Sequence, residues 1–207
     1  LIEPVYTTYY CTKHYKICKP LFSILKWWKT YSKDTIKRLT EFNNLRTNTE
    51  QICFNDDSTQ IDIASSIINH GGSLADAYLK NKIKGIFSSP PYVGLINYHE
   101  QHAYAYELFD FERNDNKEIG SMLSGSGKEA QRRYVEGIVN VLLNSKKYLA
   151  ERYEVFLVAN DKFNLYPQIA ELSGMQIVDE FKRPVLNRTE KDKRAYSETI
   201  FRMKEKC

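Results

Sequence analysis

The 207-residue sequence contains no run of about 18 apolar residues, so no segment of it predicts a membrane-spanning helix. Its four cysteines are too few and too scattered for a disulfide framework, and we therefore expect a reducing, cytoplasmic setting. Residues Leu1–Pro4 lack the basic flank and the apolar stretch of a secretory signal, and they also lack an initiating Met. We expect the natural reading frame to begin upstream of Leu1.

The composition is that of a globular protein, with 42% hydrophobic and 27% charged residues. The charge is unevenly distributed, because residues 1–50 hold nine Lys and Arg but only four Asp and Glu, together with nine aromatic residues. A basic, aromatic-rich segment before a nearly neutral body is typical of a chain that binds an anionic, stackable partner such as nucleic acid. A helix with lysines facing solvent explains the same composition.

Residues 1–48 predict a helical segment that is separate from a body of residues 49–207. Pro20 is suited to the first turn of a helix, and Leu21, Leu25 and Trp28 fall on one helical face. We expect a break at 32–34, a second short helix after it, and a linker over residues 43–50. The N-terminal segment is a candidate part of a target-recognition region.

From residue 51 onward, short apolar runs alternate with helical patterns. The pattern predicts an α/β domain with a mainly parallel sheet and an antiparallel strand pair at the C-terminus. The predicted strands are 51–54, 84–87, 154–159, 176–181 and 198–203, and the predicted helices are 61–69, 99–109, 129–149 and 165–172. Ligands bind such sheets at the carboxyl ends of the parallel strands, which here lead into Asp57-Ser58, Ser88–Tyr92 and Asn160-Asp161.

The tetrapeptide Ser89-Pro90-Pro91-Tyr92 directly follows one of these strands. Two consecutive prolines can neither continue a helix nor donate to a sheet, so they predict a stiff extended turn whose carbonyl groups lack intramolecular partners. A small polar side chain precedes the turn and an aromatic ring follows it. This arrangement suits a planar group with an amino function, such as a nucleobase, although proline pairs after strands are often only loop chemistry.

The run from Ile86 to His102 resembles the catalytic loop of S-adenosylmethionine-dependent DNA methyltransferases that modify an exocyclic amino group, N4 of cytosine or N6 of adenine. Residues 156–161 and 182–189 resemble later blocks of the same family, and the resemblance covers roughly residues 51–203. It implies a Rossmann-like methyltransferase sheet, S-adenosylmethionine as cofactor and double-stranded DNA as partner. It also implies a restriction–modification or phage setting, in the cytoplasm with the nucleoid and without a membrane.

The resemblance assigns roles at the tetrapeptide. Enzymes of this family flip the target base out of the duplex, because its amino group is not accessible inside the stack. Ser89 and the Pro90 carbonyl would accept hydrogen bonds from the amino group, Pro91 would stiffen the turn, and Tyr92 would stack on the base, a contact worth about 1–3 kcal/mol. Methyl transfer would be a direct in-line displacement without a metal. Serine at the first position favours N4 of cytosine, with N6 of adenine or an RNA substrate as the alternatives.

For the cofactor, the resemblance points to Asp57, Ser58 and Ser88. Asp57 corresponds to the acidic residue that helps to hold the adenine of S-adenosylmethionine. The alternative is that Asp57, or Ser58 in its place, caps the helix that follows.

One block of the family is missing from the sequence. The glycine-rich turn Phe-x-Gly-x-Gly is absent, and Gly125-Ser126-Gly127, the one Gly-x-Gly, follows the catalytic loop and predicts a flexible loop near the DNA or the cofactor. Three explanations remain open. The glycine-rich block belongs to a missing N-terminal region, a second chain supplies it, or the chain is a non-catalytic relative that only binds DNA.

The candidate phosphate contacts are six basic residues in two segments, each of which also has an interpretation as solvated surface: Lys13, Lys16, Lys19, Arg183, Arg188 and Lys191. Cys11, His14 and Cys18 have a spacing loosely like that of zinc ligands but no fourth ligand, so no metal site is predicted. For His99, Glu100 and His102 we expect polar contacts with substrate or helix capping.

Overall fold

The computed structural model describes residues 10–11, 16–17, 24–185 and 196–206. The chain divides into two compact units, residues 1–50 and residues 51–207. No helix among the described residues combines the length and the apolar composition needed to cross a membrane.

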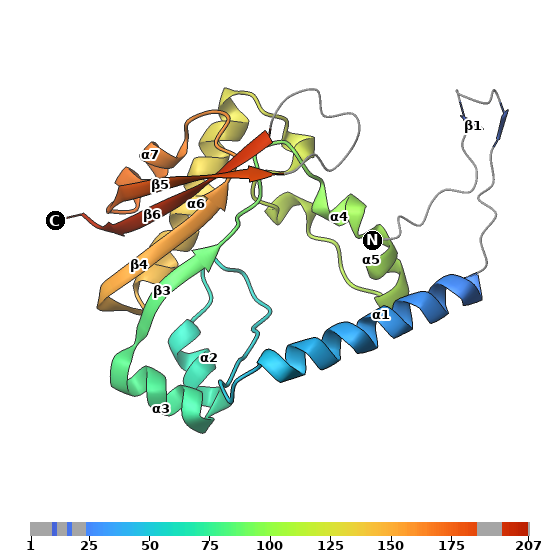
Figure 1. The fold of residues 1–207 in the computed structure, drawn as a ribbon. Coiled ribbons are helices and arrows are strands. Elements are labelled where there is room, and N and C mark those ends of the chain that lie inside the picture. The colour runs from blue at the N-terminus through green and yellow to red at the C-terminus, as the bar shows by residue number, and fades with distance from the viewer. Residues whose placement is uncertain (1–9, 12–15, 18–23, 186–195, 207) are drawn as a thin grey trace. The chain divides into compact units, whose positions relative to one another are not determined.

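The described part of the first unit contains a two-stranded ribbon and a long helix (Figure 1). Strands β1 (Tyr10–Cys11) and β2 (Lys16–Ile17) pair antiparallel, and α1 runs without interruption from Ile24 to Leu45. The break predicted at 32–34 is therefore wrong. No residue there prevents helical geometry, and Arg38 Nε donates to the Asp34 carboxylate one turn earlier at 2.7 Å. Pro20 lies outside the described residues.

The second unit is built around a four-stranded mixed sheet with the strand order β3-β4-β6-β5. β3 (Ile83–Ser88) and β4 (Leu149–Ala159) are parallel, whereas β6 (Tyr196–Glu205) is antiparallel both to β4 and to β5 (Met175–Val185). β3, β4 and β5 therefore share one direction and β6 runs against them. This confirms the predicted α/β class, with its antiparallel pair at the C-terminus.

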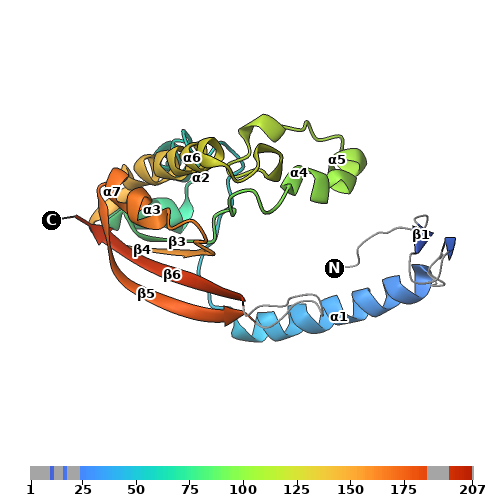
Figure 2. The same ribbon diagram turned by 90° about the horizontal axis from the view of Figure 1, so that it is seen from above.

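Helices precede and connect the strands, and α6 and α7 lie over one face of the sheet (Figure 2). In chain order the helices are α2 (Ile63–His70), α3 (Gly72–Asn81), α4 (Tyr98–Gln101), α5 (Ala103–Phe109), α6 (Lys128–Lys146) and α7 (Tyr166–Leu172). Two short 3-10 turns, Asp115–Lys117 and Met122–Ser124, lie between α5 and α6.

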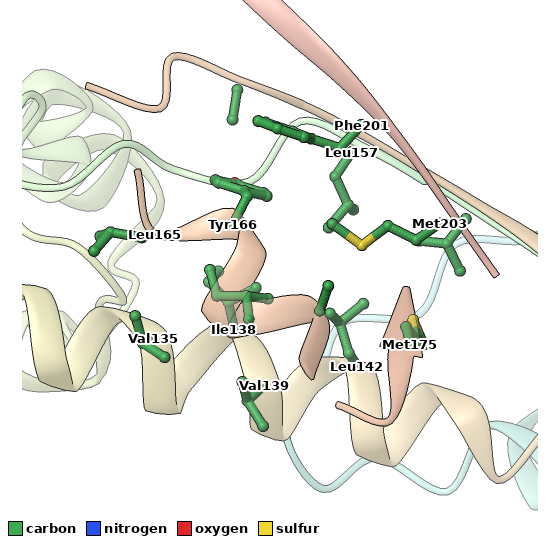
Figure 3. Packing of buried hydrophobic residues seen from close by; sticks show 14 of the residues in the cluster. Val135, Ile138, Val139, Leu142, Leu157, Leu165, Tyr166, Met175, Phe201 and Met203 are labelled. Atoms are coloured by element: carbon green, nitrogen blue, oxygen red, sulfur yellow. The ribbon is translucent and has the colours of Figure 1, made fainter. Parts of the chain in front are cut away.

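The hydrophobic core of this unit lies between the sheet and the helices α6 and α7. Apolar side chains of α6 point toward the inner face of the sheet, which contributes Leu157, Phe201 and Met203 (Figure 3). Tyr166 of α7 stacks on Phe201 with the ring centroids 4.5 Å apart. Each side chain buried here contributes roughly 1.5–3 kcal/mol, so this face holds the carboxyl ends of β3 and β4 in fixed positions.

The structure differs from the predicted elements in three places. Residues 51–54 do not form a strand, because no described strand lies beside them to complete their backbone hydrogen bonds. The predicted helix 129–149 ends at Lys146, and Leu149 already belongs to β4. Helix α3 was not predicted, because Gly71 and Gly72, expected only to end a helix, take positive φ angles that turn the chain directly into another one.

Candidate active site

The Ser89–Tyr92 corner begins where β3 ends, beside the end of β4. Ser88 is the last residue of β3 and pairs with Leu157. The Ser89 hydroxyl donates a hydrogen bond of 3.2 Å to the Val158 carbonyl oxygen. Since a hydroxyl has one hydrogen to donate and two lone pairs, this bond leaves the exposed Ser89 oxygen available as an acceptor.

The corner is also attached to α6. The Tyr134 hydroxyl donates to the Pro91 carbonyl oxygen at 2.9 Å and lies 3.1 Å from the Tyr166 hydroxyl. Burial raises the pKa of Tyr134 to about 12, so its phenol remains protonated at neutral pH. The expectation that the proline carbonyls lack partners is therefore wrong for Pro91. For Pro90, no group in the described part of the chain donates to the carbonyl oxygen.

Tyr92 is half-buried, and its ring packs against the edge of the hydrophobic core. Its hydroxyl donates to Glu198 Oε1 on β6 at 2.6 Å. The Glu198 residue is only 6% exposed, and Arg183 Nη2 lies 2.8 Å from its Oε2 as an ion pair. The ring therefore packs in part against the core, and its hydroxyl is bound to a buried carboxylate.

A cleft of about 480 Å³ opens beside this corner. Of the Ser89–Tyr92 corner only Tyr92 lines this cleft, and the residues 93–95 that follow it also contribute. The loop after β4 contributes 160–163, and the remaining lining residues are Ser126, Tyr134, Leu165 and Tyr166. The Asp161 carboxylate accepts hydrogen bonds from the backbone N–H groups of Leu165 at 2.7 Å and Tyr166 at 3.1 Å. These bonds fix the loop after β4 to the start of α7. The cleft volume of about 480 Å³ is in the range of small-molecule sites.

The loop Gly125–Gly127 lies against Gly94, two residues after the corner. Gly94 has a φ angle of +62°, and a Cβ atom there would lie 2.6 Å from the Gly125 carbonyl oxygen. Only glycine fits this close approach of two backbone segments. Beyond it lies a second cavity of about 340 Å³, which Val93 and Tyr134 also line.

No described contact joins the three predicted cofactor residues to one another. Ser88 lies at the carboxyl end of β3. Asp57 Oδ1 accepts hydrogen bonds from the N–H and the hydroxyl of Thr59, which lower its pKa, and Gln60 donates to Oδ2. Asn144 of α6 donates to the carbonyl oxygen of Ser58 at 3.3 Å. The helix cap predicted at Asp57 or Ser58 is wrong, because Asp62 caps α2.

The predicted phosphate contacts are described only in part. Arg183 belongs to β5, and its side chain is 54% exposed beside Glu198. Lys16 lies in β2, but its side chain is outside the description. The others, Lys13, Lys19, Arg188 and Lys191, lie outside the described residues, as do His14 and Cys18.

His99, which follows the corner, belongs to a polar cluster. His99 Nδ1 hydrogen-bonds to the Tyr106 hydroxyl, and Arg113 pairs with both Asp115 and Glu100. His102 separates α4 from α5. Within the described ranges, no group of three or more His, Cys, Asp or Glu side chains is arranged to hold a metal ion.

Sequence reasoning missed Tyr134, Tyr166 and Glu198. The two tyrosines fit the apolar patterns of their helices, so the pattern indicated packing and not a polar contact. Glu198 carried a weak signal, as an acidic residue at the start of the loosely alternating strand pattern 198–203. Its partner Tyr92 lies 106 residues away, and no local pattern predicts that contact.

Comparison with known proteins finds a close relative. No protein-family model matches the chain. The chain is similar to the Type II methyltransferase M.MjaII of Methanocaldococcus jannaschii, with 50% identity over 204 residues. The alignment covers 99% of this chain but only 38% of that relative, so the chain spans less than half of the relative's length. The aligned region includes nearly all of the described residues.

Proposed function

We propose that this chain contains the catalytic corner of a methyltransferase that transfers a methyl group to an exocyclic amino nitrogen of a base in double-stranded DNA. The relative's description as a Type II methyltransferase supports this proposal, and it supports a restriction–modification role and a cytoplasmic location. The geometry of Ser89–Tyr92 supports the choice of an amino nitrogen as the acceptor.

The observation that carries the proposal is the hydrogen bond from Ser89 to the Val158 carbonyl. It leaves the Ser89 oxygen able only to accept, and no described group donates to the adjacent Pro90 carbonyl oxygen. An exocyclic amino group has two hydrogens to donate to these oxygens. Accepting both bonds would leave the nitrogen lone pair less delocalised into the ring and directed away from the corner.

Tyr92 completes the proposed base site. Its ring lies at the edge of the 480 Å³ cleft, and the cleft exceeds the volume of a single nucleobase. A base extruded from a duplex would stack on the ring, a contact worth about 1–3 kcal/mol. Leu95 and Phe163 add apolar surface to the same cleft.

S-Adenosylmethionine would supply an electrophilic methyl group. The residues present fit only part of a site for it. The Asp57 carboxylate already accepts three hydrogen bonds within its own turn. Gly125, in the sequence's one Gly-x-Gly, lies in a loop against Gly94 and not after a described buried strand. We therefore propose that a region outside this chain, or a second chain, completes the cofactor site beside the β3 edge.

The preferred target is N4 of cytosine, because the corner begins with serine. Incubating the intact protein with labelled S-adenosylmethionine and mixed-sequence duplex DNA, followed by nucleoside analysis, tests both the activity and the base. We expect label in N4-methylcytosine. Label in N6-methyladenine would overturn the base assignment alone, and label found only in RNA would overturn the choice of DNA.

The chain of 207 residues is assayed beside the intact protein. We expect turnover to need the additional region or second chain that we propose to complete the cofactor site. DNA binding without methyl transfer by either form would instead favour a non-catalytic DNA-binding protein and overturn the proposed function.

A further inference from the structure

We propose that Glu198 is a positioning residue that holds the Tyr92 ring in one orientation at the cleft. The inference rests on the proposed function, because Tyr92 is the residue assigned to the base. It begins from one contact: the Tyr92 hydroxyl donates to Glu198 Oε1 at 2.6 Å, and this bond joins the corner after β3 to strand β6.

The burial of Glu198 makes this contact strong. The residue is 6% exposed, and a buried carboxylate is retained at a large free-energy cost unless charged and hydrogen-bonding partners surround it. A phenol that donates to a carboxylate forms a charge-assisted bond, shorter and stronger than one between neutral groups. Losing Tyr92 as donor would leave this carboxylate with one partner fewer in the interior.

Arg183 supplies the positive charge. It lies directly opposite Glu198 in the β5–β6 register, with its Nη2 atom 2.8 Å from Glu198 Oε2. The Arg183 side chain is 54% exposed, so it pairs with the carboxylate from the solvent side. Tyr92 and Arg183 therefore share one carboxylate, which links the C-terminal strand pair to Tyr92.

A free tyrosine ring turns about two side-chain bonds. Fixing its hydroxyl restricts both rotations and sets the orientation in which the ring meets a stacking base. Small misplacements near a reacting centre can cost about 100-fold in rate. We therefore expect Glu198 to affect the rate of methyl transfer within the protein–DNA complex and not the affinity for DNA.

The same unit contains a matched arrangement at the other end of β4. The Tyr153 hydroxyl donates to Glu205, and Lys146 pairs with Glu205 Oε1 at 2.7 Å. This second set has the same chemistry, tyrosine with carboxylate and cation, but none of its residues lines the 480 Å³ cleft. It provides controls for the loss of a tyrosine–carboxylate bond as such.

The test is a double-mutant cycle on the intact protein, with single-turnover methylation rates and DNA dissociation constants as readouts. Glu198→Ala and Tyr92→Phe are each expected to lower the rate about 10- to 100-fold, with DNA affinity changed less than about threefold. The double variant should be no slower than the slower single one, because both changes break the same bond. Glu198→Gln keeps an acceptor oxygen and should recover part of the rate. Tyr153→Phe and Glu205→Gln should stay within about twofold of the parent rate.

The free energy of unfolding in urea, measured for the same four proteins, reports the Tyr92–Glu198 contact independently of catalysis. We expect coupling between Tyr92 and Glu198 there as well, and the melting curves show whether each variant folds. A parent-like rate for Glu198→Ala, or losses that multiply in the double variant, would overturn the positioning role while leaving the proposed function intact. Absence of methyl transfer by the parent protein would overturn both.

Discussion

The Tyr134 hydroxyl of α6 donates a hydrogen bond to the Pro91 carbonyl oxygen at 2.9 Å, which ties the corner after β3 to the helix behind the sheet. Together with the bonds from Ser89 to Val158 and from Tyr92 to Glu198, it attaches three of the four corner residues to three different elements. The corner is therefore rigid because of tertiary contacts as well as its prolines.

Replacing Tyr134 by Phe should weaken both the fold and the activity. The change leaves the Pro91 carbonyl without its donor, and an unsatisfied buried acceptor costs about 1–3 kcal/mol. Urea unfolding of the 207-residue chain measures this loss. Tyr148→Phe is the matched control, since the Tyr148 hydroxyl donates to the Ile61 carbonyl oxygen at 3.2 Å, away from the corner. Equal effects of the two changes on methylation rate would contradict a role for Tyr134 at the corner.

Replacing Ser89 by Ala should lower the methylation rate about 10- to 100-fold, the range typical of losing one positioned hydrogen bond to a reacting group. DNA affinity should change little, because the hydroxyl would contact only the amino group of the base. Ser66→Ala removes a comparable bond, from a serine hydroxyl to the Asp62 carbonyl oxygen, on α2. A filter-binding assay and a rate assay on the three proteins separate the effects. Equal losses of rate and affinity in Ser89→Ala would count against its assigned role.

Replacing Gly94 by Ala should be strongly destabilising. The new Cβ atom would lie 2.6 Å from the Gly125 carbonyl oxygen, so the backbone must shift. Residue 94 also has a φ angle of +62°, which is strained for alanine. We expect a loss of about 1–3 kcal/mol in the free energy of unfolding. Gly125→Ala is the control, because its φ angle is +69° but no atom lies within 4 Å of the added Cβ. If both variants lose the same stability, the close packing of the two loops does not matter.

Acid should weaken the sheet through Glu154. Hydrogen bonds from Arg202 and then Lys204 lower the pKa of this carboxyl from 4.5 to about 2. A depressed carboxyl pKa stabilises the fold above the unfolded-state value, and that contribution is lost as pH falls toward the folded-state value. The free energy of unfolding should therefore decline between about pH 5 and pH 2. Glu154→Gln should flatten this decline in urea titrations at several pH values, and an unchanged profile would exclude Glu154 as a cause.

Much of the fold follows from local patterns in the sequence. Val155–Val158 predicted a buried strand, and the structure confirms the strand, with Phe156 only partly buried. Tyr134, Ile138 and Leu142 predicted a helical face, which the structure also confirms. Predictions failed where local signals are ambiguous. Ile52 and Phe54 alternate like a strand but have no described neighbour to pair with, and Ser32–Asp34 is polar without preventing a helix.

The sequence by itself determined the position of the corner, because two prolines after an apolar run force a turn wherever the chain folds. Only the tertiary structure decided which groups hold that corner. Tyr134, Val158 and Glu198 lie 43, 69 and 106 residues from the residues they bind. Such contacts depend on the strand order and on the packing of α6 against the sheet. A pattern of neighbouring residues contains neither.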